Sequence, residues 1–163
     1  MAAGATPAIR ALVADGAGHT VHSYDHDPRS DSYGSEAVDV LAARLGVGPR
    51  QVFKTLILEL STGSLAVAVL PVPDTLSLKA AAAALGVPKA SMADRAKAER
   101  GTGYVLGGIS PLGQRRRHPT VIDISALGWE TVLCSAGRRG LEIELAPGDL
   151  VRLAGAVTAA VTA

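Results

Sequence analysis

Helix-capping residues and alternating apolar positions divide the chain into short predicted elements. Thr6 is a favourable N-cap and Pro7 suits the first helical position, so a helix is predicted from there to the glycines at 16 and 18. Apolar runs on both sides of residues 61–64 (Ser-Thr-Gly-Ser) predict a hairpin. The predicted strands cover residues 19–24, 52–60, 65–72, 120–124, 131–135 and 141–145. Further predicted helices begin at Ser35, Ser77 and Asp94, and a closing helix covers 149–161.

The order of these elements predicts the fold class. Strands and helices are interleaved irregularly and one hairpin is antiparallel, which favours an α+β fold with a mixed sheet over a doubly wound parallel sheet. Residues 25–35 are expected to form a loop, and the glycines and proline in residues 101–113 exclude a regular helix there. The sequence shows no internal repeat and no linker, so residues 1–163 are interpreted as one domain.

Composition narrows the classes of function. The chain has 163 residues, 48% of them hydrophobic, which is enough for one core. A single cysteine excludes an internal disulfide and a multi-thiolate zinc site, and 3% aromatic residues leave little for stacking single-stranded bases. Without a secretory signal or a long apolar stretch, a cytoplasmic protein is expected. No metal or cofactor, and neither DNA nor a membrane as partner, is expected.

Charge is distributed unevenly along the chain, although the formal net charge is only +1. Residues 85–118 carry seven basic and two acidic side chains, a net of +5, whereas residues 1–60 carry five basic and seven acidic ones, a net of −2. The basic segment overlaps the glycine-rich segment and ends in Arg115, Arg116 and Arg117. It is either a local phosphate-binding face or a charged run that aids solubility.

Lys54 is the clearest candidate for a chemical role. In the strand around it, Val52, Lys54 and Leu56 share one face, while Phe53 and Thr55 share the other. An ammonium on an apolar face is unfavourable unless it is paired or lines a polar cavity, where it can hold a phosphate, a carboxylate or a polarised carbonyl. The alternative is an edge-strand lysine whose ammonium reaches solvent.

The glycine-rich segment offers a backbone cradle rather than a nucleophile. Residues 107–111 (Gly-Gly-Ile-Ser-Pro) suit a loop whose N–H groups point into a cavity, although the same pattern also occurs in plain tight turns. The segment is neither a P-loop nor a dinucleotide fingerprint. His22 and His26 fall at a strand-to-loop boundary, which disfavours a metal site, and Cys134 lies in an apolar strand as a structural thiol would. No side chain emerges as a nucleophile.

Several motifs, taken together, resemble the YbaK/EbsC family of aminoacyl-tRNA deacylases, which are relatives of the editing domain of prolyl-tRNA synthetase. The motifs lie in order within about residues 6–153 and include 24–27 (Tyr-Asp-His-Asp), 53–56 (Phe-Lys-Thr-Leu), 102–104 (Thr-Gly-Tyr), 107–114 (Gly-Gly-Ile-Ser-Pro-Leu-Gly-Gln) and 137–141 (Gly-Arg-Arg-Gly-Leu). The lysine strand followed by the 107–114 motif is the specific combination. The sequence departs from the pattern at Cys134, and His118 has no assigned role.

The resemblance implies a barrel-like mixed sheet surrounded by helices, with a small pocket. It implies catalytic roles for Lys54, which would hold the terminal adenosine or acyl ester, and for Gly107, whose main chain would position the aminoacyl group. The residues it places at the substrate are Tyr24, Asp27, Thr55, Gly108, Ile109 and Ser110. It also makes the three arginines 115–117 the expected contacts to tRNA.

The reaction implied by the resemblance is hydrolysis of Cys-tRNA(Pro), with prolyl-tRNA synthetase as a partner that presents the tRNA. The cysteine thiol would attack its own ester, which agrees with the absence of a nucleophile among the candidate residues. Two alternatives stay open: a deacylase of Ala-tRNA(Pro) or another small aminoacyl-tRNA, and a non-catalytic module that binds tRNA or a synthetase.

Overall fold

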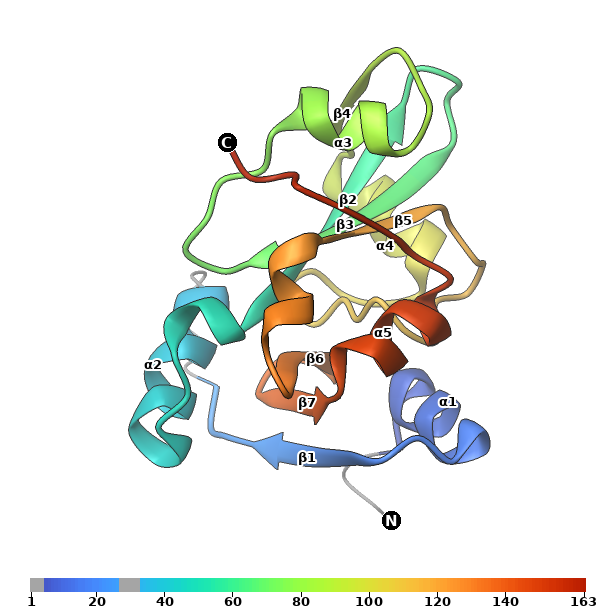
Figure 1. Ribbon diagram of the computed structural model, residues 1–163. Coiled ribbons are helices and arrows are strands. Elements are labelled where there is room, and N and C mark those ends of the chain that lie inside the picture. Colours follow the sequence, from blue (N-terminus) through green and yellow to red (C-terminus); the bar gives the residue numbers. More distant parts are fainter. Residues whose placement is uncertain (1–4, 27–32) are drawn as a thin grey trace.

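The computed structural model describes residues 5–26 and 33–163, and its helices and strands alternate irregularly along the chain (Figure 1). The helices are α1 (Pro7–Asp15), α2 (Tyr33–Leu45), α3 (Leu78–Ala84), α4 (Arg95–Thr102) and α5 (Pro147–Ala154), with short 3-10 helices η1 (Pro49–Gln51) and η2 (Ile124–Gly128). The strands are β1 (His19–Ser23), β2 (Phe53–Leu60), β3 (Leu65–Pro71), β4 (Ala90–Met92), β5 (Thr120–Asp123), β6 (Val132–Arg138), β7 (Leu141–Leu145) and β8 (Val157–Ala159).

The strands form two sheets, which confirms the predicted mixed α+β class. One sheet has the order β1-β7-β6, and the other has the order β4-β2-β3-β5-β8. The predicted hairpin β2–β3 is antiparallel, whereas β3 pairs with β5, and β5 with β8, in parallel. A single bridge between Val52 and Leu133 joins the two sheets. In the described part of the chain the hydrogen bonds do not close these sheets into one barrel.

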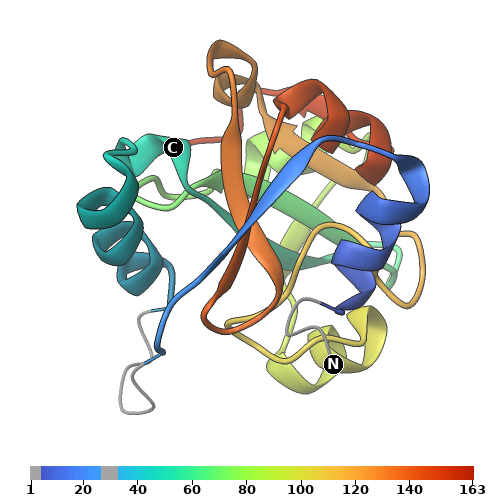
Figure 2. The same ribbon diagram turned by 90° about the horizontal axis from the view of Figure 1, so that it is seen from below.

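Strand β3 shows how the core is divided between the two faces of the larger sheet. All of its residues are buried, and they alternate between two clusters. Leu65, Val67 and Val69 belong to the main core, which also contains residues of α1, α5 and the smaller sheet. Ala66, Ala68 and Leu70 belong to a second core, beneath α3. Helices α1 and α5 lie on one side of the molecule and α2 on the opposite side (Figures 1 and 2).

The N-terminal prediction is confirmed in detail. The Thr6 hydroxyl accepts a hydrogen bond from the Ile9 amide at 3.2 Å and donates one to the Ala136 carbonyl at 2.5 Å. Gly16 ends α1 in the left-handed conformation, with φ of 79°. The N-cap therefore also anchors α1 to β6 of the smaller sheet.

Several element boundaries differ from the sequence predictions. Helix α4 extends through Gly101 and Thr102, where a regular helix was not expected, and β6 extends to Arg138. In the described part of the chain the second helix is already formed at Tyr33, so Ser35 lies inside the helix rather than at its cap.

The closing helix ends at Ala154, because Gly155 takes a left-handed C-cap with φ of 60°. Val157, which falls within the predicted closing helix, begins the strand β8 beside β5. At α5 the local C-cap at Gly155 therefore prevails over the apolar pattern that continues beyond it.

Candidate active site

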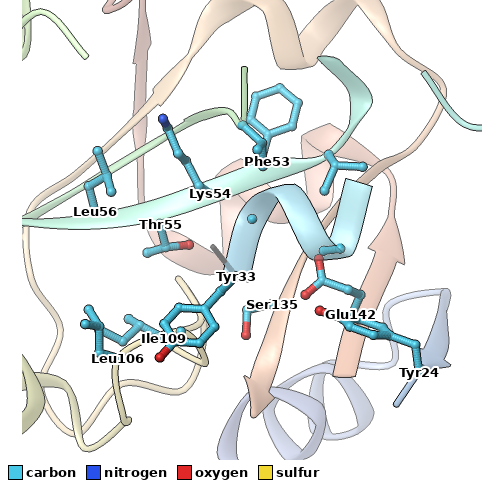
Figure 3. Close-up of a pocket in the computed structure, with 15 residues that line it drawn as sticks. Tyr24, Tyr33, Phe53, Lys54, Thr55, Leu56, Leu106, Ile109, Ser135 and Glu142 are labelled. Carbon is cyan, nitrogen blue, oxygen red and sulfur yellow. The ribbon is translucent and has the colours of Figure 1, made fainter. Parts of the chain in front are cut away.

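A small cavity opens between the start of β2, the glycine-rich segment, α2 and the smaller sheet (Figure 3). Its volume is about 180 Å³, below the roughly 300–1,000 Å³ of pockets that hold drug-sized ligands. A cavity of this size suits a small acyl group better than a whole nucleotide. The lining residues are Tyr24, Tyr33, Gly34, Ala37, Val52, Phe53, Lys54, Thr55, Leu56, Val72, Leu106, Gly107, Ile109, Ser135 and Glu142.

Lys54 and Thr55 leave β2 on opposite faces, as strand alternation predicts (Figure 3). Lys54 shares its face with Leu58, which packs in the core beneath α3, and Thr55 shares the inter-sheet face with Phe53. The Lys54 ammonium is partly buried and donates to the Asp74 carbonyl at 2.6 Å. Burial lowers the pKa of Lys54, and the negative charge of Asp74 opposes that shift. The cation is thus neither free in solvent nor sealed in the core.

The Thr55 hydroxyl is an unused hydrogen-bonding group on the cavity side. Its Oγ1 atom is buried and has no partner among the described residues. In Figure 3 it points toward the space between Tyr33 and Ser135. A buried hydroxyl left without a partner costs about 1–3 kcal/mol, so a ligand atom that bonds to it recovers that energy.

Gly107 lies where the backbone and a side chain leave no room for a Cβ. Its φ is 88°, and a Cβ would stand 2.5 Å from the Tyr33 ring. The Tyr33 ring has the Arg139 guanidinium 4.5 Å from its centroid, and its centroid lies 5.6 Å from that of His26. Tyr33 therefore covers the backbone of Gly107 at the cavity, a role that the sequence analysis did not foresee.

The other residues of the glycine-rich segment divide into two groups. Ile109 lines the cavity. Gly108 instead packs against the backbone of Arg138, where a Cβ would be 2.9 Å away. Ser110 is fully buried, and its hydroxyl accepts from the Leu112 amide at 3.2 Å. Substrate contact by Gly108 and Ser110 stays a prediction, as does contact by Asp27, which lies outside the described residues.

Glu142 is another cavity residue whose pKa is strongly shifted. It lies on β7, the middle strand of the smaller sheet, and burial raises its pKa to about 8. The Tyr24 hydroxyl points toward its carboxyl group (Figure 3), and burial together with the charge of Glu142 raises the pKa of Tyr24. In sequence Glu142 alternates with Leu141 and Ile143 as a solvent-facing residue would. Only the position of β7 in the sheet reveals that it is buried.

The three consecutive arginines lie on a different surface from the cavity. A basic groove is lined by Lys97, Arg100, Arg115, Arg116, Arg117 and His118 together with backbone of the β2–β3 turn. Lys97 pairs with Glu59 at 2.8 Å, but within residues 5–26 and 33–163 the three arginines make no ion pair. Burial and the charge of Arg116 lower the pKa of His118, whose Nδ1 lies 2.9 Å from the Gln114 amide oxygen.

Two kinds of feature are not seen in residues 5–26 and 33–163, a metal-binding cluster and a membrane-spanning helix. These residues contain no group of three or more His, Cys, Asp or Glu side chains that could hold a metal ion. Among them no helix is long and apolar enough to span a bilayer. Cys134 is fully buried, and burial raises the pKa of its thiol, as expected for a structural cysteine.

Comparison with known proteins shows the family of the chain. Residues 34–153 match the sequence profile described as the aminoacyl-tRNA editing domain. The chain belongs to this family. EbsC of Enterococcus faecalis (strain ATCC 700802 / V583), a proposed Cys-tRNA(Pro)/Cys-tRNA(Cys) deacylase, is 35% identical over 126 residues, which are 77% of each chain. The resemblance to YbaK/EbsC proteins is thereby confirmed, and the activity of this editing protein is deacylation of aminoacyl-tRNA.

Solved structures agree on the fold of this editing domain. The crystal structure of a proposed trans-editing enzyme for prolyl-tRNA synthetase superposes with a TM-score of 0.83 at 24% identity, covering 100% of this chain and 99% of the other. The crystal structure of a hypothetical protein superposes with a TM-score of 0.82 at 26% identity, covering 97% and 100% of the two chains. The two-sheet architecture is therefore that of the editing domains.

Glu142 makes the stability of the editing domain depend on pH. Its folded-state pKa of about 8 lies above the ordinary 4.5, so its contribution is fully present below the unfolded value and is lost as the pH rises through about 8. We expect the free energy of unfolding to fall by a few kcal/mol between about pH 5 and pH 9. In Glu142→Gln this part of the fall disappears. Urea unfolding of both proteins across that range measures it, and identical pH profiles would contradict the burial of this carboxyl.

Proposed function

We propose that the protein removes cysteine from Cys-tRNA(Pro), with the substrate thiol as the nucleophile. The observation that carries this proposal is the composition of the cavity. It combines the lysine Lys54 and the partly buried backbone of Gly107 with no cysteine or histidine among the described lining residues. Such a site orients an ester and stabilises charge. The Thr55 and Ser135 hydroxyls have no histidine among the described lining residues to activate them, so we expect the nucleophile to come from the substrate or from water. The likeness to EbsC, a proposed deacylase of cysteinyl-tRNA, supports cysteine as the amino acid.

In the proposed reaction the thiol sulfur attacks the carbonyl carbon of its own ester. A carbon–sulfur bond forms, the carbon–oxygen bond to the ribose breaks, and the ribose oxygen leaves with the thiol proton as a hydroxyl. Lys54 stabilises negative charge that develops on the oxygens, and the Gly107 main chain positions the aminoacyl group. Glu142 lines the cavity on the other side of β2 from Lys54, and an oxygen of its carboxyl group can accept a hydrogen bond from the substrate α-ammonium.

One observation favours a second candidate, a deacylase of Ala-tRNA(Pro) or another small aminoacyl-tRNA. The buried Thr55 hydroxyl, which has no partner among the described residues, provides a bonding site for a water nucleophile. Alanine has no thiol, so its removal would require this water.

Deacylation of Cys-tRNA(Pro) beside Ala-tRNA(Pro), each with and without prolyl-tRNA synthetase, tests the proposal. Rapid loss of cysteine with alanine retained supports the thiol-assisted reaction. Loss of both amino acids supports the water route instead. Loss of neither overturns the proposal and leaves a module that binds tRNA or a synthetase. Faster loss only when the synthetase is present supports that enzyme as the partner that presents the tRNA.

We propose further that the basic groove contacts the phosphate backbone of the tRNA through Arg115, Arg116 and Arg117. These side chains have no ion-pair partner within the described ranges, so their charge is available for phosphates. The formal net charge of the whole chain is only +1. The groove therefore binds few phosphates, which makes a presenting synthetase useful.

Replacing these three arginines with alanine should weaken tRNA binding without harming the cavity. We expect KM for aminoacyl-tRNA to rise about tenfold, and the slope of log affinity against log salt to decrease by about 0.7–0.9 for each phosphate that the groove no longer binds. Hydrolysis of a cysteinyl ester of adenosine alone should be unchanged. Lys79→Ala with Lys89→Ala is the matched control, because both lysines are exposed outside the groove. An unchanged slope of log affinity against log salt would show that the groove does not bind tRNA phosphates.

A further inference from the structure

The ammonium of Lys54 is held by a residue that does not line the cavity. Its Nζ donates to the backbone carbonyl of Asp74 at 2.6 Å, in the segment between β3 and α3. The Asp74 carboxylate accepts a hydrogen bond from Arg50 of η1 through Oδ1. Its second oxygen, Oδ2, is buried without a partner in the described part of the chain. Asp74 therefore contacts Lys54 with its backbone and Arg50 with its side chain.

The segment that carries Asp74 is fixed by other hydrogen bonds as well. The Asp74 amide donates to the Pro71 carbonyl at 3.0 Å, and the Ser77 amide donates to the Val161 carbonyl at 2.7 Å. The Ala163 amide donates to the Thr75 carbonyl at 2.8 Å. Because these bonds do not involve the Asp74 carboxylate, a change confined to that group leaves the carbonyl under Lys54 in place.

We propose that Asp74 is the positioning residue for Lys54: its carbonyl sets where the ammonium rests, and its carboxylate, oriented by Arg50, supplies the neighbouring negative charge. The inference rests on the proposed function of Lys54 in deacylation. On the described elements around Lys54, no acidic side chain other than that of Asp74 acts on the charge of its ammonium. The residue opposite Lys54 on β3 is Leu70, and the other titratable side chains of the cavity, those of Tyr24, Tyr33 and Glu142, lie on the other side of β2 (Figure 3).

This arrangement explains how a half-buried lysine keeps its charge. Burial lowers the pKa of Lys54, and Asp74 is the charged group that raises it again. Loss of a neighbouring opposite charge typically shifts a pKa by about 1 unit or more. Asp74→Asn keeps the side-chain shape and the backbone carbonyl and removes only the charge. Arg50→Gln keeps the Asp74 charge and removes its partner.

Titration of the lysine side chains by NMR tests the proposal without any substrate. The chain contains four lysines, so their ¹³C signals are few, and Lys54→Met assigns the signal of Lys54. We expect Asp74→Asn to lower the Lys54 midpoint by about 1 pH unit and Arg50→Gln to leave it unchanged or raise it. Asp15→Asn, which breaks the surface pair with Arg152, is the matched control. An unchanged midpoint in Asp74→Asn, or an equal lowering in both variants, overturns the proposal.

Kinetics then separate this inference from the proposed function. At a pH near the lowered Lys54 midpoint we expect Asp74→Asn to lower kcat for deacylation several-fold with little change in KM, because a smaller fraction of Lys54 then carries the charge that acts in the transition state. In a Lys54→Met background Asp74→Asn should have no further effect on the rate, and an additional loss there would contradict action through Lys54. A wild-type protein that deacylates nothing, while Asp74→Asn still shifts the Lys54 midpoint, would refute the proposed function and leave the positioning role standing.

Discussion

Lys54→Ala should lower the rate of deacylation at least about a hundredfold and leave the fold intact. Removal of a single group that stabilises developing negative charge in an active site costs about 10²–10³ in kcat. The loss of fold stability is expected to be small, because the Lys54 side chain is only partly buried and its ammonium makes one hydrogen bond within the described residues, to Asp74. Single-turnover deacylation of cysteinyl-tRNA, together with thermal unfolding, measures both effects.

Two further variants distinguish the charge of Lys54 from its packing. Lys54→Met keeps the aliphatic stem against the neighbouring apolar residues and removes only the ammonium, so it should be as inactive as Lys54→Ala. Lys79→Ala removes an exposed lysine of α3 and should deacylate at the wild-type rate. A folded Lys54→Met protein with wild-type activity would exclude the lysine from the chemistry.

Gly107→Ala should cause the second large loss, because two obstacles meet at this residue. The φ of 88° is unfavourable for any residue with a Cβ, and that Cβ would stand 2.5 Å from the Tyr33 ring. The left-handed backbone alone costs about 1–2 kcal/mol. Displacement of Tyr33 or of the 107–109 backbone would then disturb the cavity, so we expect deacylation to fall at least about tenfold.

Gly86 provides the matched control for this prediction. Its φ is 74°, similar to that of Gly107, but a Cβ there would meet nothing within 4 Å. Gly86→Ala should therefore lose about 1–2 kcal/mol of stability and no activity. In Gly107→Ala combined with Tyr33→Ala the steric obstacle is removed and the backbone strain stays. Wild-type activity in Gly107→Ala itself would show that the cavity does not depend on the backbone at this position.

The sequence predicts best where a local signal and the tertiary structure agree. Thr6 and Pro7 begin a helix in both, and the alternation of β2 correctly separates the faces of Lys54 and Thr55. The closing helix was predicted too long, because the pattern did not reveal that Val157 would extend the sheet beside β5. Backbone conformation at Gly155 and pairing with a strand more than 30 residues earlier decide that boundary.

The candidate site was only partly predictable for a related reason. Lys54 and the glycine-rich segment carry unusual residue types for their surroundings, so they are visible in the sequence. Tyr33 and Glu142 are not unusual for their positions: Tyr33 is an aromatic residue near the start of a helix, and Glu142 is an acidic residue in an alternating strand. Their importance comes from the meeting of α2 and β7 at one cavity, a long-range arrangement that periodicity does not encode.

Residues from both faces of β2 line the cavity, so the site depends on which face of the strand each residue occupies. Lys54 and Thr55 are neighbours in sequence, so inserting or deleting a single residue between them and the hairpin turn would exchange the sides of the ammonium and the hydroxyl. Changes in the turn at residues 61–64 leave that order untouched. In a library of length variants, active proteins should thus vary freely in the turn and keep the length of β2 constant.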